Sequence, residues 1–330
     1  MTLDTTWAVV GPPPPYDPEC GAVLAALPPF PPLTAEGIPA MRAAADRFMP
    51  RPTNEDLARD GAYTVEERAV PGPDGAPGVG LIVCRPAAVE TPAPALYYTH
   101  GGGMIGGTAR DALGAVLDLA QPVGAAVVSV EYRLAPETPH PGPVEDCYAG
   151  LVWTAEHADE LGIDAARLVL IGGSAGGGLA AALALLARDR GGPSLAGQLL
   201  MCPMLDDRND TPSVHQMAAL PMWNRQANEV GWTALLGDAR GGPDISPYAA
   251  PARATDLSGL PPAFIDVGSA DTFRDEDVAY AGRIWQSGGV AELHVWPGGY
   301  HGFDGIVPHA AITKAAVAAR SDWLRRLLGY

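Results

Sequence analysis

From Tyr63 onward, short runs of apolar residues alternate along the chain with longer segments of helical character. The apolar runs predict strands at 63–70, 80–85, 95–99, 125–130, 167–171, 195–201, 263–267 and 291–296. The longer segments predict helices at 110–121, 143–161, 175–188, 274–286 and 310–328. Most of these strands are continuously apolar, which is typical of a mostly parallel sheet covered by helices on both faces. The pattern therefore predicts an α/β protein.

Two regions interrupt this alternation. Residues 1–60 are rich in proline and become weakly helical only over 36–48, so they predict an N-terminal arm that forms part of a cap. Residues 206–262 separate two consecutive strands by far more than an ordinary connection. This insertion could be an extra packed lobe or a lid, and we favour the lid, because ligands bind at the carboxyl ends of strands in α/β sheets. Residues 61–205 and 263–330 would then form the catalytic domain.

The uncharged run 168–187 is long enough to span a bilayer. Several glycines interrupt it, however, and divide it into a short apolar strand and an Ala/Leu-rich helix. We therefore predict a strand, a tight turn and a buried helix, and no membrane span. The first ten residues lack the features of a secretory signal, and the four cysteines are scattered singly, so we expect free thiols and a cytoplasmic location.

Composition narrows the possible functions. The 330 residues are 47% hydrophobic, enough for a large core, so disorder is excluded as the dominant state. The chain has 21 basic and 38 acidic residues and a net charge of −17, with no basic cluster, so we expect no binding to nucleic acid. The histidines and cysteines show no metal-ligand spacing, so no metal site is expected.

The run Gly172-Gly173-Ser174-Ala175-Gly176 matches the pattern Gly-X-Ser-X-Gly. In a chain with 40 glycines the bare pattern is weak, but here it follows an apolar strand and opens a helix, as a nucleophile elbow does. The glycines allow a sharp turn that leaves the serine hydroxyl uncovered, and the helix N-terminus favours negative charge there. A packing turn with an incidental serine is the alternative. We predict a nucleophilic serine.

His100-Gly101-Gly102-Gly103 directly follows the predicted strand 95–99. Three successive glycines lose much conformational freedom on folding, so we expect the backbone conformation that they permit to have a use. Acyl transfer needs backbone N–H donors aimed at an oxyanion, and glycines let the backbone approach closely. A phosphate-binding loop is a weaker alternative, because no Gly-Lys-Ser/Thr sequence follows.

A nucleophilic serine needs a base, and the base needs a carboxylate that orients it. Of the seven histidines, His301 lies in a glycine-rich loop directly after the last predicted strand, which is the favoured position. Asp271 lies just beyond the strand 263–267, whereas Asp275 and Glu276 begin the next helix and are expected to cap it. The order Ser174, Asp271, His301 is the order found in α/β hydrolases.

Together these motifs resemble the hormone-sensitive-lipase-like branch of the α/β hydrolases, the bacterial carboxylesterases. They occur in family order as HGGG at 100–103, YRLAPE at 132–137 with Asp146 beyond it, the serine elbow, DTFRDE at 271–276 and YHGF at 300–303. The resemblance covers about residues 60–328. It implies an α/β-hydrolase fold with a mostly parallel central sheet, helices on both faces, and a helical cap built from the N-terminal arm and the insertion 206–262.

The resemblance also implies roles for individual residues. Ser174 would be the nucleophile, His301 the general base and then acid, and Asp271 the residue that orients it. The backbone N–H groups of Gly102, Gly103 and Ala175 would form the oxyanion hole. The expected reaction is hydrolysis of short- to medium-chain carboxylic esters through an acyl-enzyme, with a small-molecule ester as substrate and with no cofactor.

Other expectations concern specificity and assembly. The apolar side chains of the insertion are expected to line the substrate pocket, namely Met217, Leu220, Met222 and Trp223. Gly173 stands where the family usually has Asp or Thr, and this departure removes a hydrogen-bonding side chain that would help brace the neighbouring loops. Pairing through the terminal strand and helix would give a homodimer, by analogy with this fold. The alternatives are a tailoring enzyme that uses the same triad for acyl transfer or acts on lactones or amides, and a non-catalytic small-molecule receptor.

Overall fold

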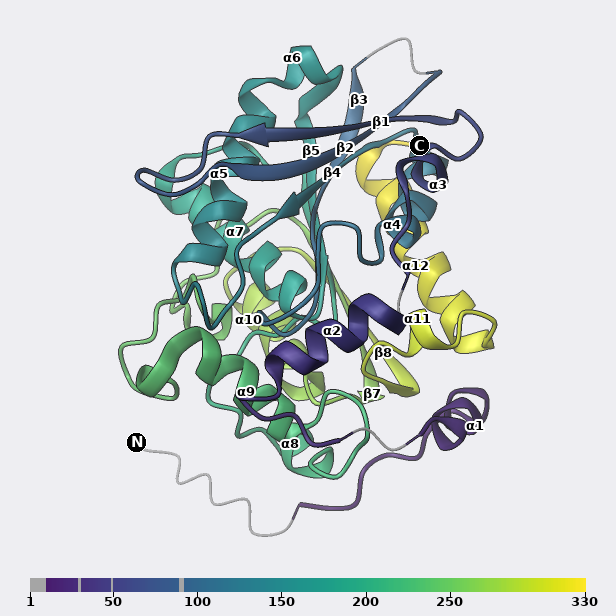
Figure 1. Cartoon of the computed structure of the whole chain (residues 1–330), viewed down its shortest axis with the longest axis vertical. Coiled ribbons are helices and arrows are strands. Elements are labelled where there is room, and N and C mark those ends of the chain that lie inside the picture. Colours follow the sequence, from purple (N-terminus) through teal and green to yellow (C-terminus); the bar gives the residue numbers. More distant parts are fainter. Residues whose placement is uncertain (1–9, 29–30, 49, 89–91) are drawn as a thin grey trace.

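The computed structural model describes residues 10–28, 31–48, 50–88 and 92–330. Eight strands form one sheet in the order β1-β2-β4-β3-β5-β6-β7-β8 (Figure 1). Their bounds are β1 Tyr63–Val70, β2 Val79–Pro86, β3 Ala93–Thr99, β4 Ala126–Glu131, β5 Ile163–Gly173, β6 Gly197–Met201, β7 Ala263–Ala270 and β8 Ala291–Tyr300. The pairs β1–β2 and β2–β4 are antiparallel and all other pairs are parallel. The predicted mostly parallel sheet is confirmed.

Helices cover both faces of this sheet. The helices that pack on it are α3 Asn54–Ala58, α4 Leu113–Ala120, α5 Gly142–Glu156, α6 Ala158–Leu161, α7 Ala175–Arg190, α10 Arg274–Gln286 and α12 Ala311–Leu328. Successive side chains of a strand point to opposite faces. Along β3, Tyr97 joins the apolar cluster beneath α5, α7 and α10, while Leu96 and Tyr98 join the cluster beneath α3, α4 and α12. The sheet is therefore the middle layer of three.

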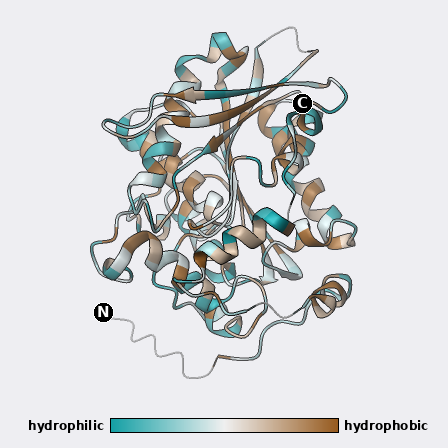
Figure 2. Cartoon of the chain, in the orientation of Figure 1, coloured by the Kyte–Doolittle hydropathy of each residue, from teal (hydrophilic) through white to brown (hydrophobic). Residues whose placement is uncertain are grey.

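The hydropathy of the strands follows their place in the sheet. Figure 2 shows β1 with mixed hydrophilic and apolar residues and the neighbouring β2 and β4 as mainly apolar. β1 is an edge strand whose ends alone are buried, whereas β4 is buried at every position except its last. Exposed polar side chains on an edge strand discourage pairing with other chains.

The uncharged run 168–187 forms the end of β5, a turn and most of α7, as predicted. β5 begins four residues earlier than the apolar run indicated. The side chains of α7 from Ala175 through Ala187 are all buried, because β5, β6 and α5 pack around the helix. No helix in the described part of the chain is long and apolar enough to cross a membrane.

The N-terminal region contains more helix than the sequence indicated. The predicted helix is present as α2 Ile38–Phe48, but α1 Pro18–Ala26 was not predicted. α1 begins because the Asp17 side chain accepts hydrogen bonds from the backbone N–H groups of Glu19 and Cys20, with Pro18 as its first residue. Residues 1–9 of the predicted arm lie outside the described residues.

The insertion 206–262 contains α8 Pro212–Gln216 and α9 Arg225–Leu236, which lie with α1 and α2 in the lower half of the molecule in Figure 1. Its start is held by the two carboxylates that the sequence predicted as caps. Glu276 Oε1 accepts from Leu205 N and Asp206 N at 2.7 and 3.1 Å, and Asp275 Oδ2 accepts from Ser213 N at 2.7 Å. α10 has no side-chain cap, so the capping prediction was wrong. The two carboxylates are instead used to hold the insertion.

Candidate active site

Ser174 stands at the junction of β5 and α7, with φ of 58° and ψ of −124°. This backbone region is sparsely populated for a residue with a side chain and costs about 1–3 kcal/mol, which the surrounding structure must offset. The turn is possible because its glycines approach other backbone closely. A Cβ at Gly172 would lie 2.3 Å from Gly176 O, and one at Gly176 would lie 2.0 Å from Thr99 O. The result is a partly exposed serine at the carboxyl end of the sheet.

The three residues that the sequence predicted as a triad lie in one chain of hydrogen bonds. His301 Nε2 is 3.0 Å from Ser174 Oγ, and His301 Nδ1 is 3.0 Å from Asp271 Oδ2. Because a carboxylate can only accept, Nδ1 carries the proton and Nε2 is free to accept from the serine hydroxyl. Asp271 is 1% exposed, and its other oxygen accepts from Phe273 N at 2.9 Å. The imidazole is thus held in the tautomer and orientation that a base requires.

The glycine loop after β3 faces the same serine. Gly102 and Gly103 have φ of 117° and 64°, values that glycine alone adopts readily. The carbonyl of Gly102 accepts from Ile105 N and Gly106 N, which fixes the loop as a tight turn. Among the described residues, the N–H groups of Gly102 and Gly103 have no hydrogen-bond partner. Ala175 begins α7, so its N–H also lacks an intrahelical partner.

Two side chains beneath the loop fix its start. The His100 ring stacks on Tyr132 with centroids 4.1 Å apart, and the Tyr132 hydroxyl donates to His100 O at 2.8 Å. Burial lowers the pKa of His100 to about 4, so this imidazole is neutral at ordinary pH.

Arg42 of α2 fixes the far side of the same loop, a role that no local sequence pattern indicated. Its Nε donates to Ile105 O at 2.7 Å and its Nη2 donates to Ala135 O at 2.8 Å. It also forms an ion pair with Glu137 at 2.8 Å. One guanidinium therefore ties the glycine loop to the 132–137 segment.

Trp223 of the insertion lies against the glycine loop. A Cβ at Gly103 would come 2.0 Å from the indole Cη2, so the ring occupies the space that a side chain there would need. The indole N–H donates to Asn228 Oδ1 at 3.1 Å, and Thr272 Oγ1 donates to Trp223 O at 2.6 Å. The ring is thereby held between the residue after Asp271 and the glycine loop.

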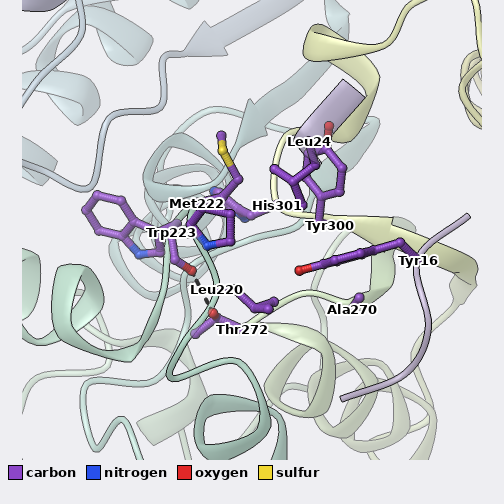
Figure 3. Close-up of a pocket in the computed structure, with 10 residues that line it drawn as sticks. Tyr16, Leu24, Leu220, Met222, Trp223, Ala270, Thr272, Tyr300 and His301 are labelled. Atoms are coloured by element: carbon purple, nitrogen blue, oxygen red, sulfur yellow. Dashed lines mark hydrogen bonds between the residues drawn. The ribbon is translucent and has the colours of Figure 1, made fainter. Parts of the chain in front are cut away.

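A small cavity of about 10 Å³ lies beside His301 (Figure 3). It is lined by Tyr16, Leu24, Leu220, Pro221, Met222, Trp223, Ala270, Thr272, Tyr300 and His301. Three of the four residues predicted to line the substrate pocket lie in this cavity wall, namely Leu220, Met222 and Trp223. The structure does not place Met217 there, because it follows the last turn of α8 and is fully buried in the protein interior. Tyr16 and Leu24 were not predicted as lining residues.

Cys202, Asp271 and His301 bring potential metal-ligand atoms within 4.8 Å of one another. Burial, together with the surrounding carboxylates, raises the pKa of the Cys202 thiol well above its usual value, so the thiol stays protonated and is a poor ligand. Asp271 already accepts from His301 Nδ1. Asp271 and His301 therefore fit a hydrogen-bonded triad with Ser174, beside the neutral Cys202 thiol, better than they fit a metal site.

Comparison with known proteins agrees with this geometry. A family model described as the alpha/beta hydrolase fold matches residues 96–305. This chain is an α/β hydrolase. Esterase LipI of Mycobacterium tuberculosis is 35% identical over 292 residues, which are 86% of this chain and 88% of LipI. Carboxylesterase NlhH of the same species is 38% identical over 278 residues, 80% of this chain and 82% of NlhH.

Among solved structures, a bacterial heroin esterase has a TM-score of 0.88 and 40% sequence identity to this α/β hydrolase. The match covers 95% of this chain and 98% of the heroin esterase, so it includes the N-terminal region and the insertion. The resemblance to the hormone-sensitive-lipase-like branch, first indicated by the order of the sequence motifs, is confirmed.

Proposed function

We propose that this α/β hydrolase is a serine carboxylesterase that acts on short- to medium-chain esters. The observation that carries the proposal is the continuous chain of hydrogen bonds from Ser174 through His301 to Asp271. Beside it lie the N–H groups of Gly102 and Gly103, which have no partner in the part of the chain that the structure describes. Relatives that share most of this chain are named as esterases and a carboxylesterase, which supports the same reaction class.

Acylation uses the geometry as follows. Ser174 Oγ attacks the ester carbonyl carbon while His301 Nε2, 3.0 Å away, takes its proton. Asp271 stabilises the imidazolium through the proton on Nδ1. The carbonyl oxygen becomes an oxyanion and accepts from Gly102 N, Gly103 N and Ala175 N, each worth ~3 kcal/mol of the barrier. The imidazolium then gives its proton to the leaving alcohol oxygen, and an acyl-enzyme remains.

Deacylation repeats these steps with water. His301 Nε2 removes a proton from a water molecule, whose oxygen attacks the acyl carbon, and the same N–H groups hold the second oxyanion. The proton then passes to Ser174 Oγ as the carboxylic acid leaves. None of these steps needs a group beyond the residues described.

We further propose that the N-terminal region up to residue 60 and the insertion 206–262 act as a cap over this site. Trp223 lies against the glycine loop, and Tyr16 and Leu24 wall the cavity beside His301. A cavity with room for about one water suits small apolar groups, which enter as the cap moves. A homodimer and a cytoplasmic location stay predictions of the sequence alone.

The test is hydrolysis of p-nitrophenyl esters from acetate to palmitate by the wild type, Ser174→Ala and Ser258→Ala. Ser258 is an exposed serine away from the site and serves as the matched control. We expect turnover of the short chains by the wild type and the control, and a loss of about 10⁴-fold or more in Ser174→Ala.

Labelling by a fluorophosphonate separates the alternatives. Labelling of Ser174 without turnover of any ester would keep the nucleophile and favour a tailoring enzyme that transfers the acyl group or acts on another bond. An absence of both turnover and labelling would favour a non-catalytic receptor.

A further inference from the structure

The N-terminal segment, residues 10–28, forms one wall of the cavity beside His301. Asp17 N donates to Gly298 O at 3.1 Å, and a Cβ at Gly298 would come 1.9 Å from Asp17 N. A side chain at position 298 would therefore displace the segment. Glu19 Oε2 accepts from Ala311 N at 2.8 Å, at the start of α12. Cys20 and Leu24 are buried in a small core with residues of the 300–316 region.

This docking directs Tyr16 into the cavity. Its ring meets Tyr300 edge to face, with centroids 5.8 Å apart. In Figure 3 the Tyr16 ring runs inward from the N-terminal segment with its hydroxyl directed toward Leu220, while the Tyr300 hydroxyl points toward Leu24. The Tyr16 hydroxyl is buried and has no hydrogen-bond partner among the described residues. Burial raises its pKa, so it keeps its proton and can donate.

A buried hydroxyl without a partner costs free energy unless something fills its hydrogen bond. A substrate atom in this cavity would do so. We propose that Tyr16 is a substrate-contacting residue whose hydroxyl donates to an oxygen on the alcohol part of the ester, so that the enzyme prefers esters of alcohols carrying a second oxygen.

The alcohol part is favoured because of where the cavity lies. The leaving oxygen must lie within reach of His301 Nε2, since it receives the proton from that atom. The cavity is lined by His301 and Tyr300 but by neither Ser174 nor the three residues proposed for the oxyanion hole. The inference rests on the proposed esterase function, and it adds a substrate class and a residue to it.

The experiment measures kcat/KM for two pairs of isosteric esters. The alcohol pair is 2-hydroxyethyl acetate and propyl acetate, and the acyl pair is ethyl 3-hydroxypropanoate and ethyl butanoate. The proteins compared are wild type, Tyr16→Phe and Tyr330→Phe. Tyr330 is 60% exposed and is the matched control, and Phe at 16 keeps the ring that packs on Tyr300.

We expect the wild type and Tyr330→Phe to have a higher kcat/KM for 2-hydroxyethyl acetate than for propyl acetate. In Tyr16→Phe this ratio of kcat/KM values should fall about fivefold to tenfold, as expected for the loss of one hydrogen bond. The ratio within the acyl pair should not change. A change in the acyl ratio instead, or no change in either ratio, would overturn the Tyr16 inference while leaving the esterase function in place. If the wild type hydrolysed none of the four esters, both the Tyr16 inference and the proposed esterase function would be overturned.

Discussion

The indole of Trp223 occupies the space that a side chain at Gly103 would need. The insertion can therefore pack against the glycine loop only because residue 103 has no Cβ. The contact joins the proposed cap to an N–H group proposed for the oxyanion hole. We therefore expect any movement of the proposed cap to shift the position of that donor.

Gly103→Ala should lower kcat by about 100-fold or more, because the new methyl would overlap the indole and φ is 64°. Adding Trp223→Ala should recover part of the loss, since it removes the overlap but not the backbone strain. Steady-state kinetics on p-nitrophenyl acetate measure both effects. Gly114→Ala, where nothing lies within 4 Å, is the control. Normal kcat in Gly103→Ala would contradict the prediction, since the loop would then accept the methyl without moving its N–H donor.

Gly173→Ala should leave activity intact and raise the free energy of unfolding by about 0.4–1 kcal/mol. The three heavy atoms nearest to a Cβ there all belong to Met201, at 3.7 Å or more, and the position does not have a positive φ. The same change at Gly176 should prevent folding, because its Cβ would lie 2.0 Å from Thr99 O. Urea denaturation of both variants distinguishes a tolerated glycine from a required one. A destabilised Gly173→Ala would contradict the prediction.

Arg42→Met should lower kcat about tenfold with little change in KM, because the carbonyls of Ile105 and Ala135 lose their donor and the glycine loop is released. Arg42→Lys should recover only part of the rate, since an ammonium cannot reproduce the planar fork. Arg47→Met, an exposed position on the same helix, is the matched control. Equal effects of the Arg42 and Arg47 substitutions on kcat would contradict the role given to Arg42.

His100 should make the protein less stable as pH falls. Its folded pKa of about 4 lies below the ordinary 6.5, so the unfolded chain binds the extra proton. The stabilisation is complete above pH 6.5 and is lost as pH falls toward 4, by about 3 kcal/mol in all.

Urea unfolding between pH 4.5 and 7 checks this by comparing the wild type with His100→Gln and with the exposed control His309→Gln. Burial raises the pKa values of Glu276 and Asp277, so these two carboxyls add stability as pH falls. They are present in both proteins, so the difference between wild type and His100→Gln reports the contribution of His100 alone. Parallel curves for wild type and His100→Gln would contradict the prediction.

The strands and helices that the structure confirms around Ser174 and His301 are those with a local signal in the sequence. The apolar run before Ser174 and the glycines around it lie within a few residues, and so do His301 and the strand before it. The strand bounds at 63–70 were predicted to the residue.

The features that the sequence did not reveal depend on contacts between distant residues. Tyr16 meets Tyr300, and Arg42 binds Glu137, across separations that leave no pattern in either segment. Asp275 and Glu276 stood where caps are common, but the 205–213 segment packs beside α10 and offers them other N–H groups. Met217 and Met222 are equally apolar, and only packing buries the first and places the second in the cavity wall.

The hydrogen bond from Asp17 to Gly298 also has a consequence for how the enzyme is made. Residues 10–28 are synthesised well before the surface that receives them, which extends from β8 to α12. A nascent chain can fold its earlier strands as they emerge, yet residues 10–28 have no surface to dock on until β8 and α12 have been made. Until those residues have been made, a ribosome-bound chain lacks both His301 and the surface that completes the cavity, so esterase activity can begin only after residues 298–316 have emerged.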